Sequence, residues 1–529
     1  MLSFARVRLV FLFCVLISLN AWCAGPFYNV LDYGAKKDGS APSTEAFAKA
    51  IAAAKANGGG TIFVPAGTYV TGPIEMISNL TLYVDAGAVL KFPAQMLPFT
   101  HGRQQGIECI TPIPLIGGYG LENVTITGRG ILTSDNAEWM KLHPRRKGSG
   151  DDPGSANGPN WAKLLADLET QTPAPAEDYE NAAPELRPSF VRFMSSKNIL
   201  IEGVRFIGSP MWTIHFLYSD QAMVRNVIIE TEPGVHADGI AIDSSRNVRI
   251  SDSYIDTGDD GIVIKAGKDA DGRRVNRPTE NVSITNVTVH RAHGAVTIGS
   301  EISGGVRNIA ASNITCQGTD IGVRIKSRRG RGGKSPVEDL RFDNWTMEDV
   351  KKGIEITSYY MMEGEKESKE EPVSERTPVF RNIAISNMTI NRAQIPITIE
   401  GLPEMPIIEL RISDVIASGK TGMKGSFTQA LELHNVQVNA EIGPAFSIRD
   451  SQELELDGIA TRAPLADTPV VRLEHCDGAI IRNSRAFPGT GTFLSVAPGE
   501  LKNVVLDGNS LASAQKATEE RSAAAGAGK

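Results

Sequence analysis

A short phrase, an Asn followed by alternating apolar residues, returns along most of this chain. Its copies begin at Asn123, Asn198, Asn226, Asn247, Asn281, Asn308, Asn382 and Asn503. Neighbouring copies between Asn198 and Asn308 lie 21 to 34 residues apart. Short strands at this interval, with Gly and Asn at the corners, are typical of a parallel β-helix. The sequence therefore predicts an all-β solenoid, and a propeller, which needs four strands in each longer unit, fits less well.

The repeat also predicts how such a solenoid is held together and closed. Stacked Asn side chains can hydrogen-bond along its axis, while inward Ile and Val fill the core. A short helix is expected to open near Thr44, with Phe47, Ile51 and Ala54 on one face, and to end at Gly58-Gly59-Gly60. We expect this helix to cover the first coil of the array.

Composition excludes several classes of protein. The chain has 529 residues, of which 41% are apolar and 22% charged, and a net charge of -7. This balance argues against nucleic-acid binding, which favours a basic surface. Cys109, Cys316 and Cys476 are widely spaced, so we expect buried free thiols rather than a disulfide framework or a zinc site. No metal or cofactor is expected.

The first residues are typical of a secretory signal peptide. Arg6 and Arg8 precede the apolar run Leu9–Leu19, and small residues follow up to Ala24. We expect residues 1–24 to be removed, 25–511 to form the β-helix, and 512–529 to be a disordered Ala- and Gly-rich tail. The mature protein would then be secreted or periplasmic. No later run is apolar enough for a membrane helix, and we expect a monomer.

Two stretches depart from the repeat, and a third is strongly basic. Residues 135–188 are polar and rich in Pro and Gly, and residues 364–377 form a charged excursion. Arg328, Arg329, Arg331 and Lys334 predict a solvated basic loop.

Carboxylates gather in one part of the repeat. Asp238 precedes the strand-like run Gly239–Ile242, and Asp259 and Asp260 precede the run Gly261–Lys265. Acids on neighbouring coils can converge on one groove, where mutual repulsion raises at least one pKa. A glycoside hydrolase needs this arrangement, with one carboxylic acid and one carboxylate on opposite sides of a bond. Each acid alone could instead be a turn-capping residue.

Four short motifs in order resemble those of the polygalacturonase family, glycoside hydrolase family 28. They are His236-Ala237-Asp238-Gly239, Gly258-Asp259-Asp260, Ala292-His293-Gly294 and Arg324-Ile325-Lys326. The resemblance runs from about Val30 to about Asn387. It implies a right-handed parallel β-helix that hydrolyses pectin with inversion and needs no cofactor.

The resemblance also implies residue roles. Asp259 resembles the general acid, Asp238 and Asp260 resemble the pair that activates water, and His293 resembles the residue that tunes the acid. Arg324 and Lys326 resemble the binders of the substrate carboxylate. Two apart on a strand, they would point to the same face. His236 takes the place of an Asn beside the substrate, and Tyr360 is similar in position to a tyrosine that contacts the sugar or packs in the core.

Five positions depart from the family pattern: His236, Ala237, Ala241, Gly261 and Ala292. The implied acid, base and basic residues are all kept, so the departures concern the sugars beside the cut bond. A rhamnogalacturonan hydrolase of the same family is therefore an alternative function. A pectate-lyase-like β-helix with Ca²⁺ bound to the acids, or a carbohydrate-binding solenoid without catalysis, are further alternatives.

The insertion at 135–188 predicts action from chain ends. It directly precedes the coils that carry the acids, so it could fold over one end of the groove. Trp139 and Trp161 could stack on sugar rings, and Arg145, Arg146, Lys147 and Arg187 could bind an anionic chain end. A mobile loop without function is the alternative.

Overall fold

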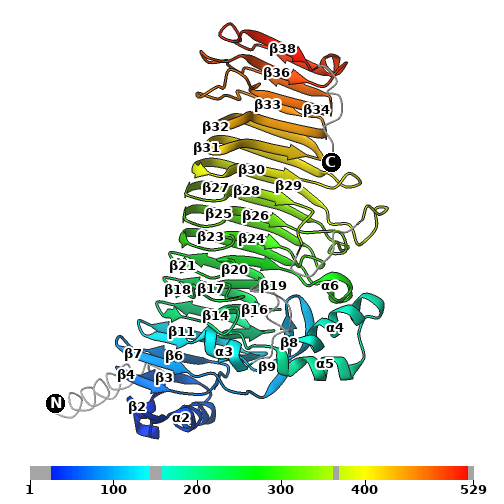
Figure 1. The fold of residues 1–529 in the computed structure, drawn as a ribbon. Coiled ribbons are helices and arrows are strands. Elements are labelled where there is room, and N and C mark those ends of the chain that lie inside the picture. The colour runs from blue at the N-terminus through cyan, green and yellow to red at the C-terminus, as the bar shows by residue number, and fades with distance from the viewer. Residues whose placement is uncertain (1–25, 143–157, 362–368, 522–529) are drawn as a thin grey trace, which may run out of the picture.

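The computed structural model describes residues 26–142, 158–361 and 369–521. The expected signal peptide, residues 143–157, the centre of the charged excursion at 362–368 and the final residues 522–529 lie outside the described residues. Within the described residues, 36 strands form one parallel sheet that winds into a right-handed β-helix, as predicted (Figure 1). The coils stack from the N-terminal end to the C-terminal end of an elongated column.

Each coil contributes strands to three rows that run along the column. The first row contains β5 (Ile74–Glu75), β10 (Ile116–Tyr119), β13 (Val191–Met194), β16 (Ile214–Leu217), β19 (Ile240–Asp243), β22 (Ile262–Lys265), β24 (Val296–Gly299), β26 (Ile321–Lys326), β28 (Lys352–Thr357), β30 (Ile395–Glu400), β34 (Val471–Asp477), β36 (Thr492–Val496) and β38 (Lys516–Glu520). This row carries the candidate site.

The other two rows complete each coil. The second row contains β1 (Phe27–Asn29), β3 (Gly60–Val64), β6 (Leu80–Val84), β11 (Glu122–Gly128), β14 (Lys197–Glu202), β17 (Asp220–Arg225), β20 (Arg246–Ser251), β33 (Glu455–Asp457), β35 (Ala479–Arg482) and β37 (Val504–Asp507). The third contains β2 (Asp38–Pro42), β4 (Gly67–Val70), β7 (Ala88–Phe92), β12 (Ile131–Ser134), β15 (Arg205–Ile207), β18 (Ile228–Glu230) and β21 (Tyr254–Asp256). Long strands join both rows in later coils: β23 (Thr279–His290), β25 (Val306–Gln317), β27 (Val337–Glu348), β29 (Phe380–Ala393), β31 (Ile407–Ser426) and β32 (Thr428–Gln452). The last parts of β31 and β32 continue into the first row, between β30 and β34.

The recurring Asn residues form the predicted ladder at a corner of the coils. Asn281 Nδ2 donates to Asn247 Oδ1 at 3.0 Å, and Asn308 Nδ2 donates to Asn281 Oδ1 at 2.7 Å. All three residues have left-handed φ values between 56° and 58°, a conformation that Asn adopts more readily than most residues. The repeat therefore reflects a corner that needs both a left-handed backbone and an amide side chain. Alternating Ile, Val and Leu fill the interior, as expected.

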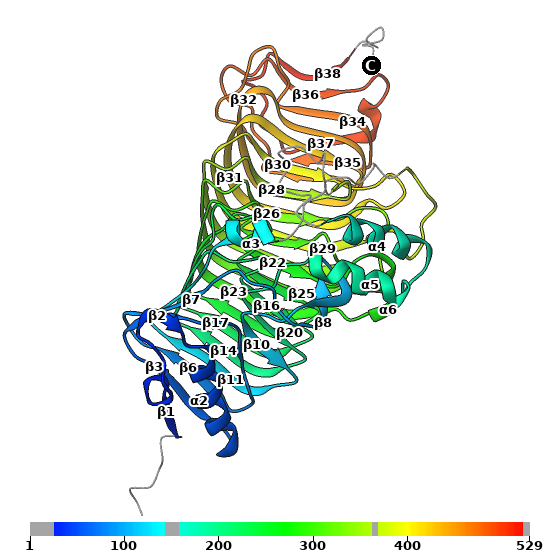
Figure 2. The same ribbon diagram turned by 60° about the horizontal axis from the view of Figure 1, so that its bottom comes forward.

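The N-terminal end of the column is covered by α2 (Thr44–Ala56), close to its predicted bounds (Figure 2). Phe47, Ile51 and Ala54 on this helix are buried against the first coils. The C-terminal end differs from the prediction, because Lys516–Glu520 form strand β38 against β36. The disorder that we expected over residues 512–529 is therefore wrong for residues 516–520. Cys109, Cys316 and Cys476 are buried free thiols, as predicted.

Residues 135–188 are more ordered than their composition predicts. The described part forms α3 (Asn136–Leu142), α4 (Pro159–Thr170), α5 (Ala176–Ala182) and the 3₁₀ turn η3 (Ala183–Glu185). Figures 1 and 2 both show α4 and α5 beside the hairpin of β8 (Phe99–Gln104) and β9 (Ile107–Pro112) and beside α6 (Asp269–Val275). Trp161, Leu164 and Leu186 pack with Ile107 and Cys109 of the hairpin in a small second core.

Two further short turns, η1 (Val30–Tyr33) and η4 (Leu501–Asn503), complete the structure. Among the described residues, every helix is too short or too polar to cross a membrane.

Candidate active site

The predicted acidic residues lie on adjacent coils at the same edge of the first row. In the chain, Asp238 lies two residues before β19, and Asp260 lies two residues before β22, directly after Asp259. Strands β19 and β22 pair in register. The backbone N–H of Gly239 donates to the carbonyl oxygen of Asp260 at 3.0 Å. The parallel coils therefore bring the three carboxylates together.

Asp260 is held by cations from a later coil. Its Oδ1 accepts from Arg324 Nη1 at 3.2 Å and from Thr297 Oγ1 at 2.9 Å, and its Oδ2 accepts from Lys326 Nζ at 2.9 Å. Burial opposes ionisation of this acid, but the charges of Lys326 and Arg324 lower the pKa of Asp260 below its ordinary value. Asp260 is therefore an ionised carboxylate whose oxygens are fixed in place.

Asp259 faces outward beside His293. The two side chains approach at 3.4 Å between Asp259 Oδ1 and His293 Nδ1, and their exposed fractions are 22% and 56%. Although burial opposes the shift, the hydrogen bond with His293 and nearby positive charge lower the pKa of Asp259. The same hydrogen bond raises the pKa of His293 above 6.5. This pair is the part of the acidic cluster that a ligand can reach.

Asp238 has the opposite electrostatic character. It is only 3% exposed, and burial, followed by the charge of Asp259, raises the pKa of Asp238 well above its ordinary value. The three acids are thus separated into one group whose pKa is raised, Asp238, and two groups whose pKa values are lowered, Asp259 and Asp260. Such a separation is characteristic of acid–base sites, where one group must donate a proton and another accept one.

Arg324 and Lys326 point to the same side of β26, as predicted, and both also contact Tyr360. The Tyr360 ring centre lies 4.7 Å from Lys326 Nζ and 5.5 Å from Arg324 Cζ, within the range of cation–π attraction. Beside them, a hollow of about 200 Å³ is lined by His293, Asp320, Ile321, Arg324, Lys351 and Lys352. The cations therefore border open space on the later-coil side of the carboxylates.

Gly294 makes the close packing around Asp260 possible. A Cβ atom at Gly294 would lie 2.2 Å from Thr297 Oγ1 and 2.8 Å from Asp260 Oδ1. Any side chain there would displace the hydroxyl that bonds Asp260. Gly258 is also required for close contact, because its Cβ would meet the backbone of Gly234 at 2.3 Å.

Residues 175–441 match the sequence profile of Glycosyl hydrolases family 28, about half of the chain. The chain belongs to glycosyl hydrolases family 28. Residues 27–113 match a second profile, Rhamnogalacturonase A/epimerase, pectate lyase-like. The family assignment makes the chain a glycoside hydrolase and accounts for the four ordered motifs.

Individual relatives of this family 28 chain include plant and bacterial proteins. A probable polygalacturonase of Vitis vinifera is 28% identical over 407 residues, which cover 74% of each chain. An exo-poly-alpha-D-galacturonosidase of Dickeya chrysanthemi is 28% identical, over 63% of this chain and 57% of the relative. Among solved structures, a hyperthermoactive exopolygalacturonase from Thermotoga maritima is 33% identical, with a TM-score of 0.68 over 78% of this chain and 92% of the other.

Two buried charges of the family 28 site were not predicted from the sequence. Lys265 Nζ bonds Glu301 Oε2 at 3.0 Å and lies 4.9 Å from the centre of the Trp212 ring. Lys265 ends β22 and points to the same side of the row as the acids. The alternation along Gly261–Lys265 was a signal for this position, whereas the loop after β24 that carries Glu301 has no periodic signal.

The basic loop after Lys326 differs from its prediction at Arg329 and Arg331, whereas Lys334 is exposed as expected. Arg329 is 4% exposed and Arg331 is 0% exposed, so neither is a solvated residue. Arg329 forms an ion pair with Glu404, and Arg331 lies 6.0 Å from the centre of the Tyr360 ring. This loop is therefore part of the packed wall of the site.

The aromatic and basic residues expected to bind sugar from the insertion are placed differently. Trp139 is 1% exposed and donates to Ser134 Oγ, and Trp161 is 3% exposed and donates to Gln105 Oε1. Arg187 is 1% exposed and contacts His236. Predicted stacking of Trp139 and Trp161 on sugars is therefore wrong, because their indole rings complete the fold. Arg145, Arg146 and Lys147 lie outside the described residues.

The hairpin β8–β9, rather than the insertion itself, covers the first row on the earlier-coil side. Arg103 Nη1 bonds Asp243 Oδ1 at 2.7 Å, and Arg192 Nη1 of β13 bonds Thr111 Oγ1 at 2.9 Å. At the hairpin tip, a Cβ on Gly106 would lie 2.9 Å from Glu301 Cγ. The hairpin thus ends directly against the Lys265–Glu301 pair, and helix α4 braces it through Trp161.

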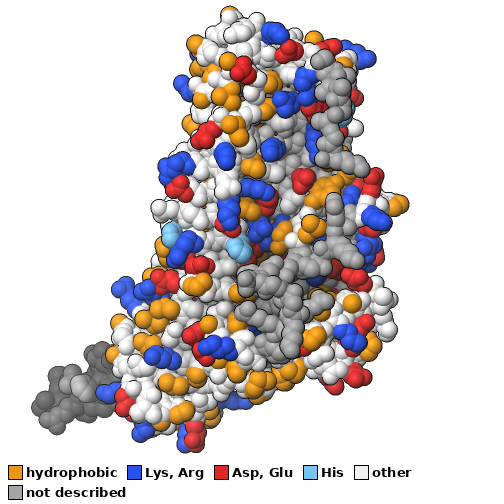
Figure 3. All heavy atoms as spheres, in the orientation of Figure 1, with side chains coloured by type: hydrophobic (Ala, Val, Ile, Leu, Met, Phe, Trp, Pro, Cys, Tyr) orange, Lys and Arg blue, Asp and Glu red, His pale blue; other side chains and the backbone are white. Residues whose placement is uncertain are grey.

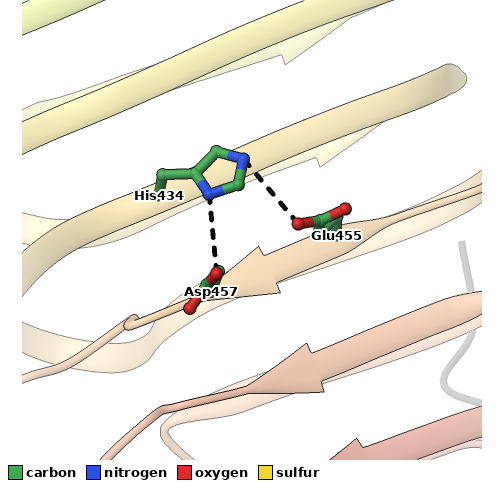
Figure 4. Close-up of side chains that lie close together, drawn as sticks. All are labelled: His434, Glu455 and Asp457. Atoms are coloured by element: carbon green, nitrogen blue, oxygen red, sulfur yellow. Dashed lines mark ion pairs between the residues drawn. The ribbon is translucent and has the colours of Figure 1, made fainter.

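Charges elsewhere on the molecule form mixed networks. Figure 3 shows acidic and basic side chains interspersed along the column. One cluster, His434, Glu455 and Asp457, lies on β32 and β33 (Figure 4), several coils beyond β19 in the column (Figure 1). Arg482 pairs with both carboxylates of this cluster. Since Arg482 supplies the compensating charge, the cluster is a surface ion-pair network and gives no reason to infer a metal.

Proposed function

We propose that this glycoside hydrolase is a polygalacturonase that cleaves galacturonosyl linkages in pectin with inversion and acts at chain ends. The acidic cluster supplies groups for proton donation and for activation of water. Arg324 and Lys326 supply positive charge for a uronate beside the bond to be cut. The relatives named above as polygalacturonases and exo-acting enzymes support the same substrate class.

In the proposed reaction, Asp259 donates its proton to the glycosidic oxygen as the bond from C1 to that oxygen breaks. Water attacks C1 from the opposite face, and the Asp238–Asp260 pair accepts the proton that water loses. Inversion requires room for this water, which places the acid and base roughly 6.5–9.5 Å apart in enzymes of this kind. Asp259 is the better donor to substrate because its side chain is more exposed than those of Asp238 and Asp260.

For this mechanism, Asp259 must carry a proton when the substrate is bound. In the free protein the raised pKa of Asp238 and the lowered pKa of Asp259 favour the proton on Asp238. The two groups interact strongly, so their titration belongs to the pair. We propose that substrate binding, which covers Asp259 and removes it from water, moves this proton to Asp259. Desolvation favours the neutral carboxyl, so the direction of the transfer follows from burial by the sugar.

The observation that carries the chain-end proposal is the asymmetry of the first row around the carboxylates. On the earlier-coil side, the outward residues Arg192, His215 and Asp243 are at most 4% exposed because the hairpin covers them. On the later-coil side, Thr398 and Ser447 are partly exposed and Lys424 is exposed. This asymmetry supports a site in which the polymer extends toward the later coils and its other end lies against the hairpin.

Product analysis tests this proposal. Purified protein is incubated with polygalacturonate and, separately, with rhamnogalacturonan, and the first products are identified by chromatography and mass spectrometry. We expect mono- or digalacturonate from polygalacturonate at the earliest time points, and none with the Asp259→Asn protein. A spread of longer oligomers would contradict chain-end action. If products appear from rhamnogalacturonan alone, the substrate is rhamnogalacturonan rather than polygalacturonate. Unsaturated, ultraviolet-absorbing products would show that the protein is a lyase.

A further inference from the structure

The insertion at 135–188 reaches the catalytic region through two polar side chains at its ends. Asn136, at the start of α3, donates through Nδ2 to the carbonyl oxygens of Ser209 at 2.8 Å and Pro210 at 3.2 Å, and its Oδ1 accepts from Val235 N at 3.3 Å. Arg187, just after η3, donates through Nη1 to Pro210 O at 2.5 Å and to Val235 O at 3.0 Å. Both residues therefore hold the turn that precedes Asp238.

Arg187 makes one additional contact that Asn136 does not make. Its Nη2 lies 3.4 Å from Nδ1 of His236. A guanidinium group can only donate hydrogen bonds and stays protonated at any pH at which the protein is folded. His236 Nδ1 must therefore be the acceptor, and the ring proton of a neutral His236 must be on Nε2.

We propose that Arg187 is a positioning residue that holds His236 as one neutral tautomer, so that Nε2–H is a fixed hydrogen-bond donor to a substrate oxygen beside Asp259. This inference rests on the proposed function, because it assigns His236 a partner on the bound sugar. Arg187 is buried and contacts the Nδ1 edge of the ring, so Nε2 is the ring nitrogen that remains to face a ligand. His236 itself is partly exposed and lies in a turn with a left-handed backbone (φ 54°).

The charges around His236 favour the neutral ring. Burial, followed by the positive charge of Arg187, lowers the pKa of His236 to about 4. Lys265 on β22 acts in the same direction, whereas Asp259 and Glu301 act in the opposite direction. The ring is therefore neutral at pH values well above 4. A neutral donor can bind a hydroxyl or a carboxylate oxygen without adding charge next to the reacting bond.

This arrangement accounts for one departure from the family pattern. The family motif has an Asn where this chain has His236, and an amide N–H₂ is also a neutral donor. Arg187 gives the imidazole the same character by blocking its other nitrogen. The insertion thus contributes to the site by fixing a ring nitrogen and a turn, which differs from the predicted role of covering the groove.

Nitrogen NMR of the free protein tests the tautomer without any substrate. With histidine labelled at both ring nitrogens, the His236 signals are assigned by their loss in His236→Asn. We expect a proton on Nε2 and no titration of His236 between about pH 5 and pH 8, where an ordinary histidine titrates. In Arg187→Met we expect both tautomers and a titration shifted toward 6.5. A wild-type His236 protonated on Nδ1, or one that titrates near 6.5, would overturn the proposal.

Kinetics with a matched control separate this role from simple bracing. Asn136→Ala loosens the same turn but leaves the Arg187–His236 contact in place. We expect kcat/KM of Arg187→Met to gain a titration displaced from the wild-type His236 pKa toward the ordinary histidine value, and that of Asn136→Ala to keep the wild-type pH profile at a lower level. Identical profiles for the two variants would refute the role of Arg187. If Arg187→Met does not fold, Arg187→Gln, which also removes the positive charge, serves in the same comparison.

The donor itself is tested at position 236. His236→Ala should lower kcat/KM roughly tenfold, the worth of one net hydrogen bond of about 1.4 kcal/mol, whereas His236→Asn should recover most of the loss. Equal activity of His236→Ala and wild type would show that His236 does not donate a hydrogen bond to the substrate. If wild type releases no galacturonate at all, the proposed function fails, and the NMR result still decides the tautomer.

Discussion

Lys326 Nζ lies 2.9 Å from Oδ2 of Asp260, although the two residues are 66 positions apart in the sequence. Lys326 was predicted from motif resemblance to bind the substrate carboxylate, yet in the free protein its charge is directed at Asp260, the proposed base. Arg324 shares this arrangement through Oδ1 of Asp260. In the proposed mechanism, the two cations would therefore serve both the substrate and Asp260.

The first prediction follows from this double contact. Lys326→Met should raise KM, because a uronate loses a charge partner, and should also lower kcat, because the pKa of Asp260 rises when its cation is removed. The acid limb of the kcat profile should move to higher pH. We expect a loss of roughly 10²-fold in kcat/KM, corresponding to about 3 kcal/mol for charge-assisted bonds. A change in KM with an unchanged kcat profile would limit Lys326 to substrate binding.

A second prediction concerns the identity of the proton donor. Asp259→Asn should reduce turnover of polygalacturonate by at least roughly 10²-fold, since general acid catalysis contributes 10²–10⁴. The same variant should retain much of its activity on an aryl galacturonide whose leaving group needs no proton. Asp238→Asn should lose activity on both substrates. If Asp238→Asn is the variant that recovers with the activated leaving group, the donor is Asp238 and the roles are exchanged.

A third prediction uses the pH dependence of His293. The hydrogen bond with Asp259 raises the pKa of His293 above 6.5. A raised pKa in the folded state stabilises the protein below the unfolded pKa, and this contribution is lost as pH rises through the folded value. The difference in unfolding free energy between wild type and His293→Gln should therefore be larger at pH 5 than at pH 9. In Asp259→Asn, NMR titration should show the His293 pKa displaced downward; an unchanged pKa would contradict the pairing.

The sequence predicted the coils and the acidic cluster because both depend on local patterns that the fold repeats. Asn281 occupies a corner whose left-handed backbone and stacked amide recur in each coil, so the period was visible. Asp238 and Asp259 lie just before strands of neighbouring coils, so their proximity followed from the repeat. Arg324 and Lys326 lie two apart on one strand, which fixed their common direction.

The covering elements could not be predicted in the same way. The hairpin that contains Arg103 interrupts the coils without a period of its own, and its partner Asp243 is 140 residues away. Trp139 and Trp161 stand in a polar segment that resembles a surface loop, but each indole N–H has a buried acceptor that only the tertiary fold supplies. Arg187 carried a charge that suggested an anionic ligand, whereas its partners are backbone carbonyls and a histidine.

The most direct test of chain-end hydrolysis compares viscosity with reducing ends on long polygalacturonate. Both are followed in one reaction, with the Asp259→Asn protein as the background control. Because the hairpin β8–β9 covers the first row on the earlier-coil side, the proposed chain-end action predicts that reducing ends accumulate while viscosity falls slowly, in proportion to the sugar released. A rapid loss of viscosity while few reducing ends have formed would show internal cleavage and contradict the closed site.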